Sequence, residues 1–152
     1  MTIPRLAGIH HVKIPVTELT RSIQWYESVF DLRVVMQFPD ATGELQGVVG
    51  EIDGLGPAVL AMRLNPAASA GIRGFDPIAF AVDGRDDILA WAAHLDALQI
   101  EHSPVFEASE GWMLVFADPD GLELHLYSWA RHGVDHSTLE GYGAPVAETD
   151  TP

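Results

Sequence analysis

Apolar and polar residues alternate over several short segments of the chain, a pattern typical of half-buried β-strands. The alternation is strictest in residues 122–128, where three leucines point to one face and Glu123, His125 and Tyr127 to the other. The Asp-Pro-Asp-Gly sequence that precedes this strand predicts a tight turn, in which Gly121 can take a positive φ. Alternation also predicts the following strands: 9–16, 33–39, 46–52, 58–64, 76–82, 102–107 and 111–117.

Two longer segments, 18–30 and 86–98, place apolar residues three or four positions apart, which predicts helices with one buried stripe. Thr17 is expected to cap the first helix, and Asp31 to end it, because Asp tolerates the left-handed conformation better than most residues. Residues 65–74 are rich in Pro, Ala and Gly and are expected to form a linker.

The order strand-helix-strand-strand-strand occurs twice. Three pairs of like residues, each 66 positions apart, mark the repeat: Val16 and Val82, Trp25 and Trp91, and Leu32 and Leu98. We therefore expect an α+β fold of two βαβββ modules whose curved sheets form a shared cavity, lined by the small and polar strand faces. The expected divisions are 6–66, 74–129 and a C-terminal extension, 130–152, with a flexible end.

Composition narrows the possible partners. The chain has 152 residues, no cysteine and a formal net charge of −14, which argues against nucleic acid and anionic membranes as partners. The same charge is compatible with a cationic ligand, although many proteins are simply acidic. No apolar run approaches the ~20 residues that cross a bilayer, and no signal peptide is recognised, so cytoplasm is the expected compartment.

The motifs together resemble one family. They are His11-Val12 leading to Glu18-Leu19, the segment 22–26, the segment 78–83, and the Asp-Pro-Asp-Gly turn at 118–121. On these residues the chain resembles the vicinal oxygen chelate superfamily over nearly all of 8–128. This superfamily includes glyoxalase I, extradiol dioxygenases, methylmalonyl-CoA epimerase, fosfomycin-resistance enzymes and bleomycin-binding proteins.

The resemblance implies metal ligands on the first and last strand of each module. Carried over to this sequence, these positions fall on His11, on Ala61 or its neighbour, on Pro77 and on His125. Two imidazoles would supply half of a usual site for Zn²⁺, Ni²⁺, Mn²⁺ or Fe²⁺, whereas Ala61 and Pro77 cannot coordinate a metal. No nucleotide or flavin is expected.

Other side chains on the same strand faces carry candidate chemistry. Glu123 is either a further carboxylate ligand or the general base that abstracts a proton next to a carbonyl, and Tyr127 can donate a hydrogen bond to a developing oxyanion. Lys13 and Arg63 can bind a substrate carboxylate. In the plain structural alternative, Lys13 and Arg63 point into solvent at a sheet edge, and Tyr127 fills space.

Three further histidines carry less information. His132 and His136 would share one face of a helix, but Gly133 weakens a helix there. His10 is expected to be a hydrogen-bonded core residue, on the strand face opposite His11.

Three functions stay open at this point. The first is a metal-assisted lyase, isomerase or oxygenase that acts on a small oxygenated molecule. The second is a metal-free ligand-binding or antibiotic-binding protein, and the third is a degenerate module with a structural or regulatory role. In each case a homodimer is expected, because a two-module chain leaves sheet edges exposed.

Overall fold

The computed structural model describes residues 2–146, which form two compact units. Of the described residues, the first unit contains 2–75 and 118–122, and the second contains 76–117 and 123–146. Most of the C-terminal end expected to be flexible falls on 147–152, outside the described residues. Within 2–146, no helix is long and apolar enough to cross a bilayer.

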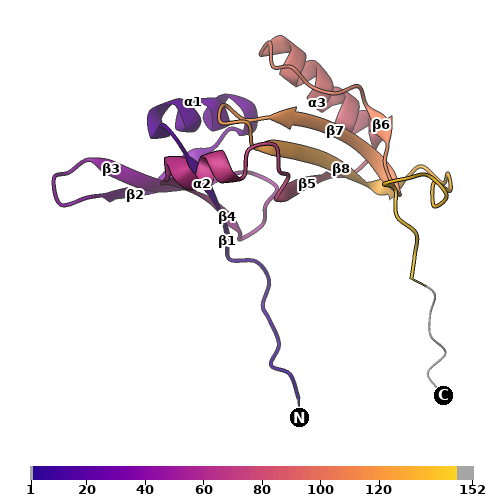
Figure 1. Cartoon of the computed structure of the whole chain (residues 1–152), viewed down its shortest axis with the longest axis horizontal. Coiled ribbons are helices and arrows are strands. Elements are labelled where there is room, and N and C mark those ends of the chain that lie inside the picture. Colours follow the sequence, from indigo (N-terminus) through magenta and orange to yellow (C-terminus); the bar gives the residue numbers. More distant parts are fainter. Residues whose placement is uncertain (1, 147–152) are drawn as a thin grey trace. The chain divides into compact units, whose positions relative to one another are not determined.

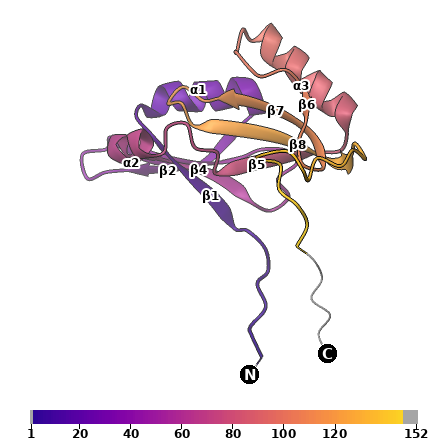
Figure 2. The same ribbon diagram turned by 45° about the vertical axis from the view of Figure 1, so that its right-hand side comes forward.

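The first unit is a four-stranded mixed sheet with two helices (Figure 1). The strands lie in the order β1-β4-β3-β2, with β1 parallel to β4 and the other neighbours antiparallel. Residues 2–10 precede the sheet as an extended segment that leads away from it (Figures 1 and 2). The elements are β1 (His11–Val16), α1 (Leu19–Phe30), β2 (Arg33–Pro39), β3 (Leu45–Glu51), β4 (Val59–Leu64) and α2 (Pro66–Gly71).

The second unit repeats this topology. Its strands lie in the order β5-β8-β7-β6, again with the first strand parallel to the last, and α3 lies across β7 and β8 (Figure 1). The predicted α+β fold of two βαβββ modules is therefore confirmed, while the cavity shared by both sheets stays a prediction. The elements are β5 (Ile78–Val82), α3 (Arg85–Ala97), β6 (Phe106–Glu107), β7 (Gly111–Ala117) and β8 (Glu123–Arg131).

The apolar strand faces form the cores, as the alternation predicts. In the first unit Ile14, Leu60 and Met62 are buried with Tyr26 of α1. The second core contains the apolar side chains of β7 and β8 together with those of the α3 stripe, namely Leu114, Phe116, Leu124, Leu126, Ile88 and Leu95. Burial of these side chains on one face leaves the opposite face of each sheet for other chemistry.

The Asp-Pro-Asp-Gly turn is a buried hydrogen-bonding centre of the first unit. Asp118 Oδ1 accepts hydrogen bonds from the backbone N–H groups of Asp120 and Leu122, and Gly121 has a φ of 80°. The Asp120 carboxylate accepts bonds from the Thr17 backbone, the Thr17 hydroxyl and Arg21. The predicted turn is confirmed, and its carboxylates secure it to the start of α1.

Several local predictions are wrong for identifiable reasons. Thr17 does not cap α1, because its hydroxyl is bonded to Asp120, and Glu18 caps the helix instead. His10 is exposed rather than in the core, and its Nδ1 lies 3.1 Å from Nδ1 of His11. The expected linker contains α2, which begins with an Asn65 cap and a proline in the first turn.

Candidate functional site

The polar face of β8 carries Glu123, His125 and Tyr127, as the alternation predicts. His125 lies opposite Ala79 of β5 on one side and Val115 of β7 on the other. These two cross-strand neighbours are small or apolar and offer the imidazole no hydrogen-bond partner from their side chains. Its side chain is 14% exposed, which leaves it accessible while still shielded.

His125 is held between two carboxylates. Its Nε2 lies 2.7 Å from Glu123 Oε1, and its Nδ1 lies 3.4 Å from Asp76 Oδ2. An imidazole with an acceptor at each ring nitrogen is fixed in orientation, and the nearer carboxylate forms a charge-assisted hydrogen bond when the ring is protonated. We call Asp76, Glu123 and His125 the β8 cluster.

Asp76 is the site residue that sequence reasoning missed. It is the first residue of the predicted strand 76–82, but it lies two positions before β5, and the alternation placed it on the apolar face with Ile78. The parallel register of β5 and β8, in which Ile78 faces Leu124, carries residue 76 to the beginning of β8. The register could have been inferred from the repeat, since β1 and β4 pair in the same way.

The β8 cluster fits a divalent metal ion. One nitrogen and two carboxylate oxygens are donors for first-row divalent ions, and the three candidate ligand atoms lie within 4.8 Å of one another. An ion bound at about 2.1 Å from each donor would need them about 3 to 4 Å apart, a small adjustment. The donor set and its spacing are therefore compatible with one shared ion.

Tyr127 is fixed by the backbone of the β6–β7 connection. Its hydroxyl oxygen accepts hydrogen bonds from the N–H groups of Glu110 and Gly111, at 3.0 and 3.3 Å. The phenol is thus held two residues from His125 on the same strand face. A hydroxyl that accepts two bonds can still donate its own hydrogen.

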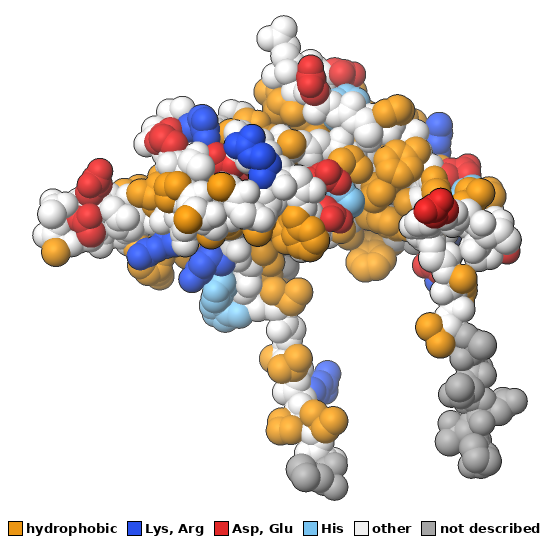
Figure 3. Space-filling model, viewed as in Figure 1, with side chains coloured by type: hydrophobic (Ala, Val, Ile, Leu, Met, Phe, Trp, Pro, Cys, Tyr) orange, Lys and Arg blue, Asp and Glu red, His pale blue; other side chains and the backbone are white. Residues whose placement is uncertain are grey.

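In the first unit, the structure brings His11, Lys13 and Arg63 to one face of the sheet. Lys13 pairs in register with Ala61, and Arg63 pairs with Pro15, so all these side chains stand on the face opposite the core. The three cationic or imidazole groups are exposed. Figure 3 shows blue and pale-blue side chains gathered on this unit where the N-terminal segment joins the sheet.

The predicted site residues thus form two groups. Glu123, His125 and Tyr127 lie together on β8, and the other three share the first sheet. Because His11 and His125 belong to different units, their joint coordination of one metal stays a prediction. Ala61 is buried and has no ligand atom, in keeping with its expected inability to bind a metal.

Comparisons with known proteins agree with this architecture. The model of the Glyoxalase/Bleomycin resistance protein/Dioxygenase superfamily matches residues 8–126. A search of curated proteins finds no match to the sequence.

Solved structures with the same fold include proteins of different activities. Lactoylglutathione lyase from Agrobacterium tumefaciens is 19% identical, with a TM-score of 0.64 over 83% of this chain and 96% of that one. A mutant of the fosfomycin resistance protein FosX from Listeria monocytogenes, in complex with Mn(II) and 1S,2S-dihydroxypropylphosphonic acid, is 18% identical, with a TM-score of 0.64 over 82% and 93%.

An antibiotic-binding protein, TnmS3 from Streptomyces sp. CB03234, is 16% identical, with a TM-score of 0.67 over 83% of this chain and 98% of that one. Identities this low establish a shared fold and leave the activity to be argued from the site. The family match covers most of the chain, and the repeated βαβββ topology agrees with it. This chain therefore belongs to the Glyoxalase/Bleomycin resistance protein/Dioxygenase superfamily.

Proposed function

We propose that this protein is a small-molecule enzyme, a metal-assisted lyase, isomerase or oxygenase that acts on an oxygenated substrate at the β8 cluster. The observation that supports this most directly is the position of His125 between Glu123 and Asp76 on an otherwise small and apolar strip of the sheet. A fixed imidazole–carboxylate pair on an open sheet face supplies both metal donors and a proton acceptor.

In this proposal His125 Nε2 and Glu123 Oε1 would hold a divalent ion, Zn²⁺, Ni²⁺, Mn²⁺ or Fe²⁺, in place of the hydrogen bond that now joins them. Asp76, the third member of the β8 cluster, would accept the Nδ1 hydrogen of His125 and so fix the tautomer that presents a lone pair at Nε2. When bound, the ion would polarise neighbouring substrate oxygens and lower the cost of developing negative charge.

Glu123 and Tyr127 are the proposed residues for proton transfer from the substrate and for stabilising the resulting charge. Glu123 turns Oε1 toward His125 Nε2, so its other oxygen, Oε2, can take a proton from a carbon next to a carbonyl. Tyr127, held by two backbone N–H groups, donates its hydroxyl hydrogen to the oxygen on which charge develops. Lys13 and Arg63, which are exposed on one face of the first sheet, are the proposed binders of a substrate carboxylate.

A metal-free binding protein is the second candidate. It is favoured by Ala61 and Pro77, which stand at two positions where the family resemblance implies metal ligands and which cannot coordinate. TnmS3, which has the same fold, is an antibiotic-binding protein. In this case Glu123 and Asp76 would supply the negative charge for a cationic ligand.

Metal content separates the two candidates. Protein purified without a histidine tag is incubated with each of the four metals, desalted and measured by mass spectrometry. The His125→Ala variant is expected to hold one equivalent less than wild type, and the matched control His94→Ala, on the surface of α3, the same amount as wild type. Any metal held elsewhere in the chain cancels in this difference.

Equal metal content in wild type and His125→Ala would contradict the metal-assisted enzyme. Thermal-shift screening with cationic aromatic compounds would then test the binding protein, because a ligand that binds the native state raises its unfolding temperature. We also propose that the protein acts as a homodimer, argued below at the scale of the whole molecule. A cytoplasmic location stays a prediction.

A further inference from the structure

A second cluster of donors lies in the C-terminal part of the second unit, away from the β8 cluster in sequence. Glu107 ends β6, His132 directly follows β8, and His136 lies in the segment after it. Candidate ligand atoms of the three residues lie within 4.8 Å of one another. His136 Nε2 is 3.0 Å from Glu107 Oε2, and the two imidazole centroids are 5.1 Å apart.

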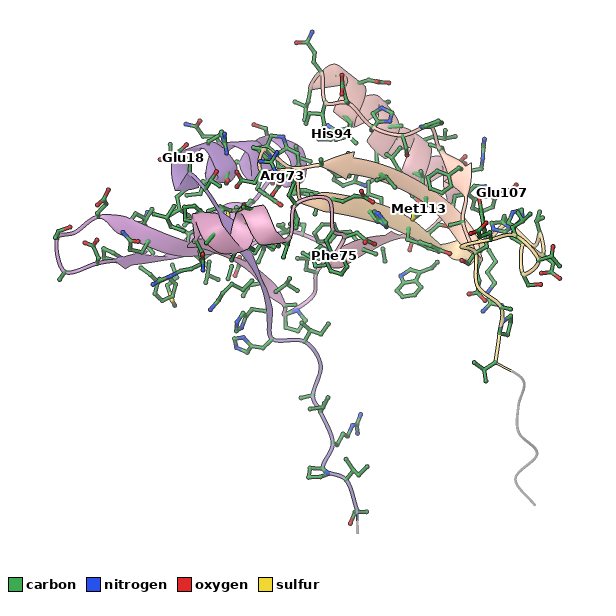
Figure 4. The ribbon with its side chains drawn as sticks, viewed as in Figure 1. Glu18, Arg73, Phe75, His94, Glu107 and Met113 are labelled. Carbon is green, nitrogen blue, oxygen red and sulfur yellow. The ribbon has the colours of Figure 1, made fainter. Side chains whose placement is uncertain are left out.

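The way in which these residues meet differs from the helical spacing considered for His132 and His136. The structure has no helix at 132–136, and the chain instead turns back toward β6 after β8. Figure 4 shows Glu107 beside the segment that follows β8. The carboxylate therefore comes from a separate strand, which the spacing of the histidines alone could not reveal.

His132 is oriented as metal-binding histidines usually are. Its Nε2–H donates to the carbonyl oxygen of Ala108 at 2.8 Å, which fixes the tautomer and leaves a lone pair on Nδ1. That lone pair accepts the N–H of Val134 at 3.0 Å, so metal binding would exchange one hydrogen bond for a coordinate bond. The rings of Trp112 and His132 pack in a T-shaped arrangement, with their centroids 5.9 Å apart.

The His136 ring packs against Tyr142 and lines a cavity. Its ring lies 5.0 Å from that of Tyr142, and its side chain is only 16% exposed. It also lines a cavity of about 500 Å³, together with Arg131 and Tyr142 among others. A metal ion at His136 would therefore have room for a water molecule or a small ligand in a remaining coordination position.

We propose that Glu107, His132 and His136 form a second metal site, specific for Zn²⁺ or a closely similar ion. Two imidazole nitrogens and one carboxylate oxygen are a donor set that suits Zn²⁺, with the fourth position open. Tetrahedral coordination at 2.0–2.2 Å places donors about 3.4 Å apart, and the 3.0 Å separation of His136 and Glu107 is close to this. Binding joins the C-terminal extension to β6.

The test uses full-length protein that carries His125→Ala, so that the β8 cluster does not contribute. Isothermal titration with Zn²⁺ is expected to show one equivalent bound. Adding His136→Ala or Glu107→Gln is expected to weaken the binding at least about tenfold, while adding His94→Ala leaves it unchanged. Co²⁺ in place of Zn²⁺ is expected to give the intense visible absorption of a tetrahedral site, and to lose it in the same two variants.

Glu107→Gln keeps the shape of the side chain, so the test survives if His136→Ala fails to fold, which circular dichroism would show. The proposal is overturned if the His125→Ala protein binds no Zn²⁺, or if neither Glu107→Gln nor His136→Ala weakens binding. A negative result in this titration does not affect the comparison of metal content between wild type and His125→Ala. The second site and the proposed function are therefore tested separately.

Discussion

At the scale of single residues, the buried pair Tyr26 and Asp118 shows that burial and hydrogen bonding have opposite effects on the pKa of a carboxyl group. The Tyr26 hydroxyl donates to Asp118 Oδ2 at 3.0 Å, and two backbone N–H groups bind Oδ1. Burial raises the pKa of Asp118 above its ordinary value of 3.8, although these hydrogen bonds act to lower it. Burial also raises the pKa of Tyr26 well above its ordinary value, and the nearby carboxylate raises it further.

A pH-dependent loss of stability follows from the raised pKa of Asp118. The folded state binds the proton more tightly than the unfolded state, so the stabilising contribution is complete below 3.8 and is lost as the pH rises through the raised pKa. The difference in unfolding free energy, wild type minus Asp118→Asn, should therefore fall as the pH rises above 3.8. Urea denaturation over this range measures it.

Asp40 is a control for which the pH dependence of stability is expected to have the opposite sign. Hydrogen bonds from Thr42, first through its side chain and then through its backbone, lower the pKa of this exposed carboxyl. The difference between wild type and Asp40→Asn should rise with pH and be lost only at acidic pH, below 3.8. A difference for Asp118→Asn that stays constant with pH would show that its carboxyl is not perturbed.

The same scale shows what the sequence could and could not predict about the site. The strict alternation of β8 places Glu123, His125 and Tyr127 on one face, because side chains in a strand have a period of two. The sequence did not reveal Asp76 or Glu107 as site residues. Asp76 meets His125 through the pairing of β5 with β8, and Glu107 meets His136 because the chain folds back after β8. A single chain contains no local signal for such contacts.

At the scale of elements, α1 begins with an unusual cap. The Glu18 side chain accepts hydrogen bonds from the N–H groups of Thr20 and Arg21, at 2.9 and 2.8 Å. Glu18→Ala leaves both groups without this acceptor and should lower the free energy of unfolding by about 0.5–2 kcal/mol. Urea denaturation checks this value.

Glu18→Gln is the matched variant, since it keeps one of the two oxygen acceptors and loses the charge and the other acceptor. It should cost less than Glu18→Ala, because one of the two capping hydrogen bonds survives while the attraction to the helix N-terminus weakens. Equal stability of wild type and Glu18→Ala would mean that water satisfies these N–H groups as well as the carboxylate does.

Elements with strong periodicity were predictable, and short irregular ones were not. The stripes of α1 and α3 fixed both helices within one residue. The predicted strand 102–107 is reduced to Phe106–Glu107, because Pro104 has no N–H and Ser103 pairs with Val115 partly through its side chain. For α2, the signals were an Asn cap and a proline, but the composition favoured a linker.

At the scale of the whole molecule, the repeat leaves β2 at the edge of the first sheet. Val35 and Met36 of this strand are each 54% exposed, and Phe38 is 42% exposed. An edge strand with free backbone groups and apolar side chains tends to pair with another chain. We expect a second copy of this protein to cover β2 in a two-fold symmetric homodimer.

Met36→Asp tests this dimer, because symmetry brings the new charge close to its copy, and such like-charge contacts cost several kcal/mol. Sedimentation equilibrium should show a dimer for wild type and a monomer for this variant. Leu89→Asp on α3, where the leucine is 40% exposed, is the control with the same added charge and should stay dimeric.

Because each chain carries a formal charge of −14, association should also strengthen with salt. A wild-type protein that stays monomeric in high salt, or a Met36→Asp dimer as stable as wild type, would contradict pairing through β2.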